Sequence, residues 1–244
     1  MDPMSIAAAS GLRSRMESLD LLANNIANTE TSGYKTDREF YSLYTSADAT
    51  SGQYTDPSQL PVIEKNYTDF SQGNLNTTSN PLDFGIQGKG FFAVSAPGGT
   101  SYTRNGTFHL SSAGTLVNAD GYSVQDANGQ PIALNSSLPV TVSADGSVIQ
   151  SGQSVGQMAL MDFAPGDLVK QGSTMFRPAN PNVKPAPSSA EIHQGKVEGS
   201  NVGSSESAVR LVNVMRQFEM LQKAVNIAGE MDRKSISEVA KIGP

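Results

Sequence analysis

Hydrophobic residues repeat with the spacing of an α-helix at both ends of the chain. Over residues 4–28 and 204–242, apolar side chains fall three and four positions apart, as they do along one face of a helix. The first stripe is Ala9, Leu12, Met16, Leu19, Ala23 and Ile26, and the second is Leu211, Val214, Phe218, Leu221, Val225 and Ala228. A helix over residues 204–242 would be about 55–60 Å long at about 1.5 Å per residue. That length is long for a globular domain and ordinary for a coiled coil.

The residues between the two stripes follow a different pattern. From residue 82 to about residue 163, short apolar runs alternate with dipeptides typical of β-hairpin turns, which are Asn105-Gly106, Asp120-Gly121, Asn128-Gly129 and Asp145-Gly146. This alternation predicts a small antiparallel β domain. The residues before and after it are polar and rich in Pro, Ser and Asn, which is typical of connecting segments.

The predicted architecture is therefore α+β, with five segments. Residues 1–35 hold the N-terminal helix, residues 36–81 an extended linker or loop, residues 82–190 the β-rich domain, residues 191–203 a return linker, and residues 204–244 the C-terminal helix. The first stripe covers fewer than three heptads, and so short a helix is marginal in water by itself. We therefore expect the two terminal helices to pair as a coiled coil, with each other and then with neighbouring copies.

The two stripes also allow a plainer interpretation, in which the helices only cover the β domain. The narrow spacing, the length of the second helix and the position at both chain ends favour self-association. The predicted subunit-interface residues are Leu12, Met16, Leu19, Asn24, Asn25, Ile26, Asn28, Leu211, Val214, Phe218, Leu221 and Val225. Two roles are open for the three asparagines: hydrogen bonds between helices that fix their register, or termination of the first helix.

Composition narrows the possible functions. The formal net charge is −6 and no segment is basic, which argues against a nucleic-acid partner. There is no cysteine, so disulfides and thiol chemistry are excluded. No apolar run approaches the roughly 20 residues of a membrane span. The first residues lack the basic start and apolar run of a secretory signal peptide.

No motif for catalysis, metal binding or cofactor binding stands out. His109 and His193 are isolated, so a structural or solvated histidine is expected at each position. The glycines of residues 85–90 resemble a phosphate loop but lack its Gly-Lys-Ser/Thr ending and do not open a helix. Asp83 and Asp162, each beside a phenylalanine, come closest to a catalytic setting, yet a turn or strand edge is the better interpretation. We therefore predict no enzymatic activity, no cofactor and no metal.

Three segments resemble a known family. Residues 23–35 contain Asn-Asn-Ile-Ala-Asn and then Thr-Ser-Gly-Tyr-Lys, which is similar to the N-terminal signature of flagellar rod, hook and hook-associated proteins. The second segment, with residues 86–94, 102–108 and 114–117, resembles the β domain that rod and hook proteins share. The third, Glu198-Gly199-Ser200-Asn201-Val202 followed by Arg216-Gln217-Phe218-Glu219, is similar to the C-terminal entry and helix of the family. One departure is Gly203, where the family often has Asp.

The resemblance implies a structural subunit of the bacterial flagellar basal-body rod. Such subunits pass unfolded through the flagellar type III export apparatus without signal cleavage. They then assemble helically in the periplasmic space, with terminal helices in an inner coiled-coil tube, and transmit torque from motor to hook. The implied partners are further copies and neighbouring rod subunits. The moderate length favours a rod subunit over a hook or hook-associated subunit, and the Met1-Asp2-Pro3 start favours the proximal over the distal rod.

Two functions of other classes stay open beside this one. A secreted β-rich adhesin would bind its ligand through residues 82–163 alone. A carbohydrate-active enzyme would use paired carboxylates in the same region. The heptads at both chain ends favour neither, because neither function needs helices that associate.

Overall fold

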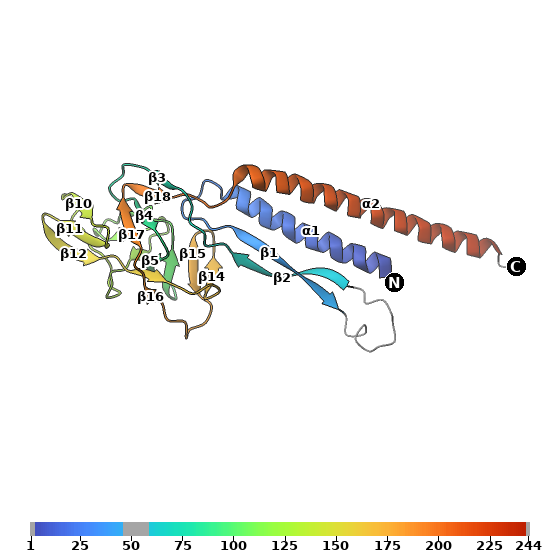
Figure 1. Ribbon diagram of the computed structural model, residues 1–244, viewed down its shortest axis with the longest axis horizontal. Helices are drawn as coiled ribbons and strands as arrows, with labels where there is room; N and C mark the ends of the chain where they lie inside the picture. Colours follow the sequence, from blue (N-terminus) through green and yellow to red (C-terminus); the bar gives the residue numbers. More distant parts are fainter. Residues whose placement is uncertain (1–2, 46–58, 243–244) are drawn as a thin grey trace. The chain divides into compact units, whose positions relative to one another are not determined.

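The computed structural model describes residues 3–45 and 59–242, and in it the first and last elements of the chain are long helices and the elements between them are strands (Figure 1). The helices are α1 (Pro3–Ala27) and α2 (Ser204–Ile242). The strands are β1 (Asp37–Thr45), β2 (Gln59–Thr68), β3 (Leu75–Thr77), β4 (Phe84–Gln87), β5 (Phe91–Ala96), β6 (Gly99–Thr103), β7 (His109–Leu110), β8 (Leu116–Val117), β9 (Ser123–Val124), β10 (Val140–Val142), β11 (Ser147–Gln150), β12 (Gln153–Gln157), β13 (Leu160–Asp162), β14 (Leu168–Gln171), β15 (Met175–Pro178), β16 (Ala186–Pro187), β17 (Glu191–Gln194) and β18 (Lys196–Glu198). The predicted combination of two terminal helices with a β-rich core is confirmed.

The chain divides into two units. The helical unit consists of Met1–Ala27, Asp37–Tyr67 and Gly203–Pro244, and the β unit consists of Asn28–Thr36 and Thr68–Val202. Each unit is therefore assembled from segments that are distant in the sequence. Among the described residues, neither helix is long and apolar enough to cross a membrane.

In the helical unit, α1 and α2 lie side by side and run in opposite directions (Figure 1). A Cβ atom added to Gly11 would lie 3.4 Å from a methyl group of Leu221, so the two helices touch closely at this point. Within residues 211–228, the six positions of the predicted α2 stripe are the ones that are not exposed. The apolar spacing therefore identified the face of α2 that is covered inside the chain.

The buried face of α1 differs from the predicted one. The buried side chains between residues 9 and 27 are Ser14, Ser18, Leu22 and Asn25, whereas Met16 of the predicted stripe is 57% exposed. The hydroxyl of Ser18 donates to the carbonyl oxygen of Ser14 at 3.0 Å, which satisfies it inside the helix. Small residues allow close approach of a neighbouring element, and a search for apolar periodicity overlooks them.

Enlarging the buried serine should therefore loosen the helical unit. We expect Ser18→Leu to destabilise the packing of α1 by about 1–3 kcal/mol, because the added carbons have no space against the neighbouring element. Urea titration followed by circular dichroism at helical wavelengths measures this loss. Ala23→Leu, at an exposed position of the same helix, is the control and should change stability by less than about 0.5 kcal/mol. Equal midpoints for the two variants would show that Ser18 is not packed as described.

Within its described residues, the segment expected as a linker, residues 36–81, contains three strands. β1 and β2 pair with each other as a two-stranded sheet, and β3 pairs with β18. The part of that expectation on residues 46–58 lies outside the described residues. Strand pairing satisfies the backbone hydrogen-bonding groups without requiring an alternating apolar pattern. The weak hydrophobic pattern of this segment therefore did not distinguish paired strands from a linker.

The expected return linker, residues 191–203, also forms strands. β17 pairs with β4 from Glu191 to Gln194, and β18 pairs with β3 from Lys196 to Glu198. Both pairs are antiparallel and join the end of the β unit to its beginning. The segment therefore closes the β unit and does more than connect it to α2.

The core of the β unit lies on both faces of β5. Phe92 and Val94 point into one buried cluster, and Phe91 and Ala93 point into the other, as alternate residues of a strand do. β5 belongs to a nine-stranded sheet in which the order β14-β15-β6-β5-β9-β8-β7 is extended by β13 and β16. The run Phe91-Phe92-Ala93-Val94 is continuous because both sides of this strand are covered.

Candidate functional site

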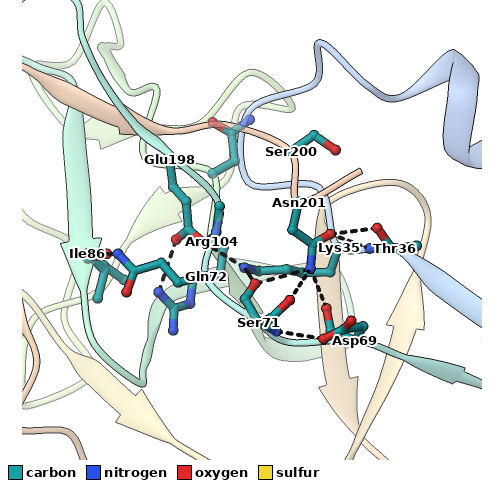
Figure 2. Close-up of polar contacts among 12 residues, drawn as sticks. Lys35, Thr36, Asp69, Ser71, Gln72, Ile86, Arg104, Glu198, Ser200 and Asn201 are labelled. Atoms are coloured by element: carbon teal, nitrogen blue, oxygen red, sulfur yellow. Dashed lines mark hydrogen bonds and ion pairs between the residues drawn. The ribbon is translucent and has the colours of Figure 1, made fainter. Parts of the chain in front are cut away.

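Three segments that are far apart in the sequence meet at a cluster of buried charges in the β unit (Figure 2). The ammonium Nζ of Lys35 lies 2.6 Å from Oε1 of Glu198, and Nη1 of Arg104 lies 3.0 Å from Oε2 of the same carboxylate. The side chains of Lys35 and Glu198 are fully buried, and that of Arg104 is 4% exposed. Two buried cations therefore share a single carboxylate away from water.

A sharp turn after α1 brings Lys35 to the cluster. Gly33 has a positive φ of 71°, which favours glycine, and its backbone N–H donates to the carbonyl oxygen of Glu198 at 2.7 Å. A Cβ at Gly33 would lie 2.2 Å from the backbone nitrogen of Asn105. The turn at Gly33 is thus packed directly on the backbone at Asn105 and at Glu198.

The Lys35 side chain is held at its tip. Besides Glu198, its Nζ donates to the carbonyl oxygen of Ser71 at 2.6 Å. Burial lowers the pKa of the Lys35 ammonium below its ordinary 10.5, while the charge and hydrogen bond of Glu198 oppose this, as does the charge of Asp69. Burial is the larger influence, so removal of Glu198 would leave a costly buried charge.

Arg104 reaches the cluster from the loop after β6. Its Nη2 donates to the carbonyl oxygen of Gly88 at 2.7 Å, and its guanidinium lies 5.2 Å from the ring centre of Phe91. Its buried Nε has no partner among the described residues. Burial lowers the pKa of Arg104, and Glu198 and then Asp162 oppose that shift. These contacts of the guanidinium are therefore all with other parts of the β unit.

Glu198 receives a third donor, from the backbone. The N–H of Gly73 donates to Oε1 of Glu198 at 2.9 Å. The carboxylate thus accepts from Lys35, Arg104 and Gly73, so both of its oxygens are engaged. Charge-assisted bonds of this kind are among the stronger ones in proteins, and they tie β18 to two earlier parts of the chain.

Asn201 forms a second connection beside the charges (Figure 2). Its Oδ1 accepts from the backbone N–H of Thr36 at 2.8 Å and from the hydroxyl of Thr36 at 2.7 Å. Its Nδ2 donates to the carbonyl oxygen of Asp69 at 2.7 Å and to that of Ser71 at 3.1 Å. The amide of Asn201 therefore joins the end of the β unit to Thr36 and to the residues at 69–71, which precede β3.

The charged groups of this cluster are buried and bonded to one another, which stabilises the fold. Within residues 3–45 and 59–242, no group of three or more acidic or histidine side chains could hold a metal ion. Nε2 of His193 donates to the amide oxygen of Gln87 at 2.7 Å, and the side chain is 30% exposed. Gly85 lies in β4, Gly88 in the bend that follows it, and Gly90 directly before β5.

The predicted interface residues fall in different environments. Leu211, Val214, Phe218, Leu221 and Val225 lie on the covered face of α2, whereas Leu12, Leu19 and Ile26 are half-buried and Met16 is exposed. Asn24 is exposed, and the side-chain oxygen of Asn28 accepts from the hydroxyl of Thr31 at 3.2 Å, in the turn that follows α1. Whether these residues contact a second copy stays a prediction.

Asn25 has a partner inside the chain. Its Nδ2 donates to the carbonyl oxygen of Asp37 at 2.9 Å, and its Oδ1 accepts from the backbone N–H of Asp37 at 3.1 Å. The side chain is 2% exposed. The two bonds fasten the start of β1 to α1, and whether Asn25 also bonds between helices to fix their register stays a prediction.

Sequence analysis did not assign a role to Lys35, Arg104 or Glu198. Each of them nevertheless lies in one of the three segments that carry the family resemblance. A charged residue inside each of three separate motifs is the signal that could have suggested a common ion cluster. Their pairing across 163 residues has no local pattern, and only the fold reveals it.

Comparison with known proteins gives consistent matches along the chain. Residues 85–150 match the family described as "Flagellar hook protein FlgE/F/G D1 domain", and residues 193–238 match "Flagellar basal body rod FlgEFG protein C-terminal". The chain is 34% identical to the flagellar basal-body rod protein FlgF of Caulobacter vibrioides over 92% of each chain. It is 37% identical to FlgF of Mesorhizobium japonicum over 82% of this chain and 83% of the relative. The rod protein FlgG of Buchnera aphidicola is 31% identical over 96% of this chain and 98% of its own length.

Proposed function

The chain belongs to the family of flagellar basal-body rod proteins, and from this premise we propose that it assembles helically through its terminal helices and transmits torque from the motor to the hook. It is a structural subunit of the basal-body rod, and its partners are other rod subunits. We extend the proposal to passage through the flagellar type III export apparatus and to a place in the periplasmic part of the rod. The proximal position within the rod stays a prediction.

The observation that carries the assembly proposal is a second apolar face on α2. Val209, Val212, Met220, Ile227 and Met231 are 49–65% exposed. At about 100° per residue, these five positions share one side of the helix, opposite the stripe that is covered within the chain. Arg216, Lys223 and Glu230 lie on the same side, so the apolar residues of this face alternate with charged ones. A helix with apolar residues on two opposite sides needs two partners.

The second partner that fits this face is a neighbouring rod subunit. On α1, the exposed Met16 and the half-buried Leu12 and Leu19 offer apolar surface as well. We therefore assign the predicted α1 residues and the second face of α2 to contacts between subunits. The predicted α2 residues, led by Val214 and Leu221, would serve the packing inside each subunit and keep the second face in place.

Charges placed on the second face should abolish assembly. In cells where the variant replaces the resident copy, we expect Met220→Asp/Ile227→Asp to prevent rod completion and swimming. Buried carboxylates without partners are too costly at an apolar contact. The unfolding midpoint of the purified variant should stay unchanged, since both side chains are exposed in the single chain.

A double variant with the same added charge is the control. Gln222 and Asn226 are exposed and lie off the second face, so Gln222→Asp/Asn226→Asp should assemble and swim. The proposal fails if the Met220/Ile227 variant is exported, folded and as motile as this control.

A further inference from the structure

A cleft of about 400 Å³ opens in the β unit, away from the charge cluster. It lies where three turns meet: the turn between β5 and β6, the turn between β8 and β9, and the turn between β14 and β15. Its volume is within the range of small-molecule sites. The polar and aromatic side chains around it are Ser101, Asp120, Tyr122, Gln171, Thr174 and Arg177. Assembly through terminal helices leaves this cleft without a role.

Arg177 supplies a fixed donor on one wall. Its Nε donates to the hydroxyl of the fully buried Ser101 at 3.2 Å, and its Nη2 donates to the carbonyl oxygen of Pro97 at 2.5 Å. These two bonds fix the plane of the guanidinium. Within the described part of the chain, its Nη1 has no hydrogen-bond partner, so this group can donate to a molecule in the cleft.

Asn118 holds an acceptor and an aromatic ring on the facing wall. It is 7% exposed, and its Oδ1 accepts from the backbone N–H groups of Asp120 at 3.1 Å and of Tyr122 at 2.8 Å. Its Nδ2 donates to Oδ2 of Asp120 at 3.3 Å. One buried amide therefore holds the backbone of both residues and the Asp120 carboxylate, and the half-buried Tyr122 packs against the core.

The chemistry of these groups selects the class of ligand. Arg177 and Asp120 have opposite charges, so the cleft has no net charge from them that would favour an anionic or a cationic molecule. Hydroxyl and amide groups from Thr174, Ser101 and Gln171 make the cleft too polar for an apolar ligand. A neutral polyhydroxyl compound both donates and accepts, and its C–H face can rest on the aromatic ring of Tyr122.

We propose that this cleft binds a neutral saccharide residue through Arg177, Asp120 and Tyr122. The donor and the acceptor would take neighbouring hydroxyls of one sugar ring, and the ring of Tyr122 would cover its apolar face. The inference goes beyond the rod function and does not depend on it. A binding site on a rod subunit is also distinct from the carbohydrate-active enzyme considered above, since Asp120 is the one carboxylate among the residues that line the cleft.

Titration of the full-length protein with neutral oligosaccharides tests the proposal. Tetramers of N-acetylglucosamine, cellulose and maltose are the probes, and backbone amide shifts in NMR spectra are the readout. We expect at least one probe to shift the amides of residues 120–122 and 171–174 saturably, with a Kd of about 1 mM, since a polar and open site gives modest affinity. Absence of saturable shifts at these residues for all three probes would overturn the proposal.

Two variants separate the cleft from binding elsewhere. Asp120→Asn removes the charged acceptor and should weaken binding about tenfold, and Gln171→Ala, at an exposed position, should weaken it less without affecting the fold. Glu191→Gln removes one charge outside the cleft, where the side chain is 66% exposed, and should leave the Kd unchanged. Equal affinity in the Asp120→Asn and Glu191→Gln variants contradicts a site at this cleft.

Discussion

The Glu198→Gln variant is expected to lose about 3–5 kcal/mol of the free energy of unfolding of the β unit. The carboxylate is the partner of both Lys35 and Arg104, and all three side chains are buried. Glutamine keeps the shape of glutamate but not its charge, and its amide N–H groups would face one of the cations. Two buried positive charges would then be left without a full counter-charge.

Chemical denaturation of the purified single chain measures this loss. Glu191→Gln is the control, because Glu191 lies on the neighbouring strand β17 with a side chain that is 66% exposed, and its loss should be below about 0.5 kcal/mol. Lys35→Met combined with Glu198→Gln should cost less than the sum of the two single changes, by at least about 0.5 kcal/mol. Additive losses, or a Glu198 variant as stable as the control, would mean that the ion cluster does not stabilise the β unit.

Gly106→Ala is the second change from which we expect a large effect, a loss of about 3 kcal/mol or more. A Cβ at this position would lie 1.7 Å from the carbonyl oxygen of Phe84 and 3.1 Å from the ring of Phe92. The backbone N–H of Phe84 donates to the carbonyl oxygen of Gly106 at 2.9 Å, so the two segments cannot separate without losing this bond. The clash is with backbone, which has little freedom to move.

The matched control is a glycine with open surroundings. A Cβ at Gly156 would meet only the Cβ of Asp126, at 3.9 Å, so Gly156→Ala should change the stability by less than about 1 kcal/mol. Thermal unfolding of both variants, followed by near-ultraviolet circular dichroism of the phenylalanine- and tyrosine-rich core, gives the comparison. Similar midpoints for the two variants would show that Gly106 is not in contact with Phe84 as described.

Periodicity predicted the parts of the fold that depend on long apolar patterns. Both helices and the covered face of α2 followed from three- and four-residue spacing, because a 39-residue helix repeats its pattern many times. The buried face of α1 did not follow, since Ser14 and Ser18 are buried by their small size and carry no hydrophobic signal. β1 and β2 were overlooked for a related reason, which is that pairing with each other does not need alternating apolar residues.

The charge cluster was beyond the reach of local patterns. No local sequence pattern marks Lys35, Arg104 or Glu198 as a member of an ion cluster. They come together only because strands that are distant in the sequence pair with each other. Asn25 shows the opposite difficulty. Its position at the end of a helix suggested two roles, and the structure gives it a third, the attachment of β1 through Asp37.

The connection between Thr36 and Asn201 has a mechanical consequence. The chain passes between the two units after residues 27, 36, 67 and 202. The two bonds and the Lys35–Glu198 pair join the crossing at residue 36 directly to the crossing at residue 202. Tension applied between the two crossings acts on this short bridge first, and the sheet between them carries little of it. The strands and turns of the β unit are thereby free to differ in sequence or to accept insertions without weakening the path along which force travels.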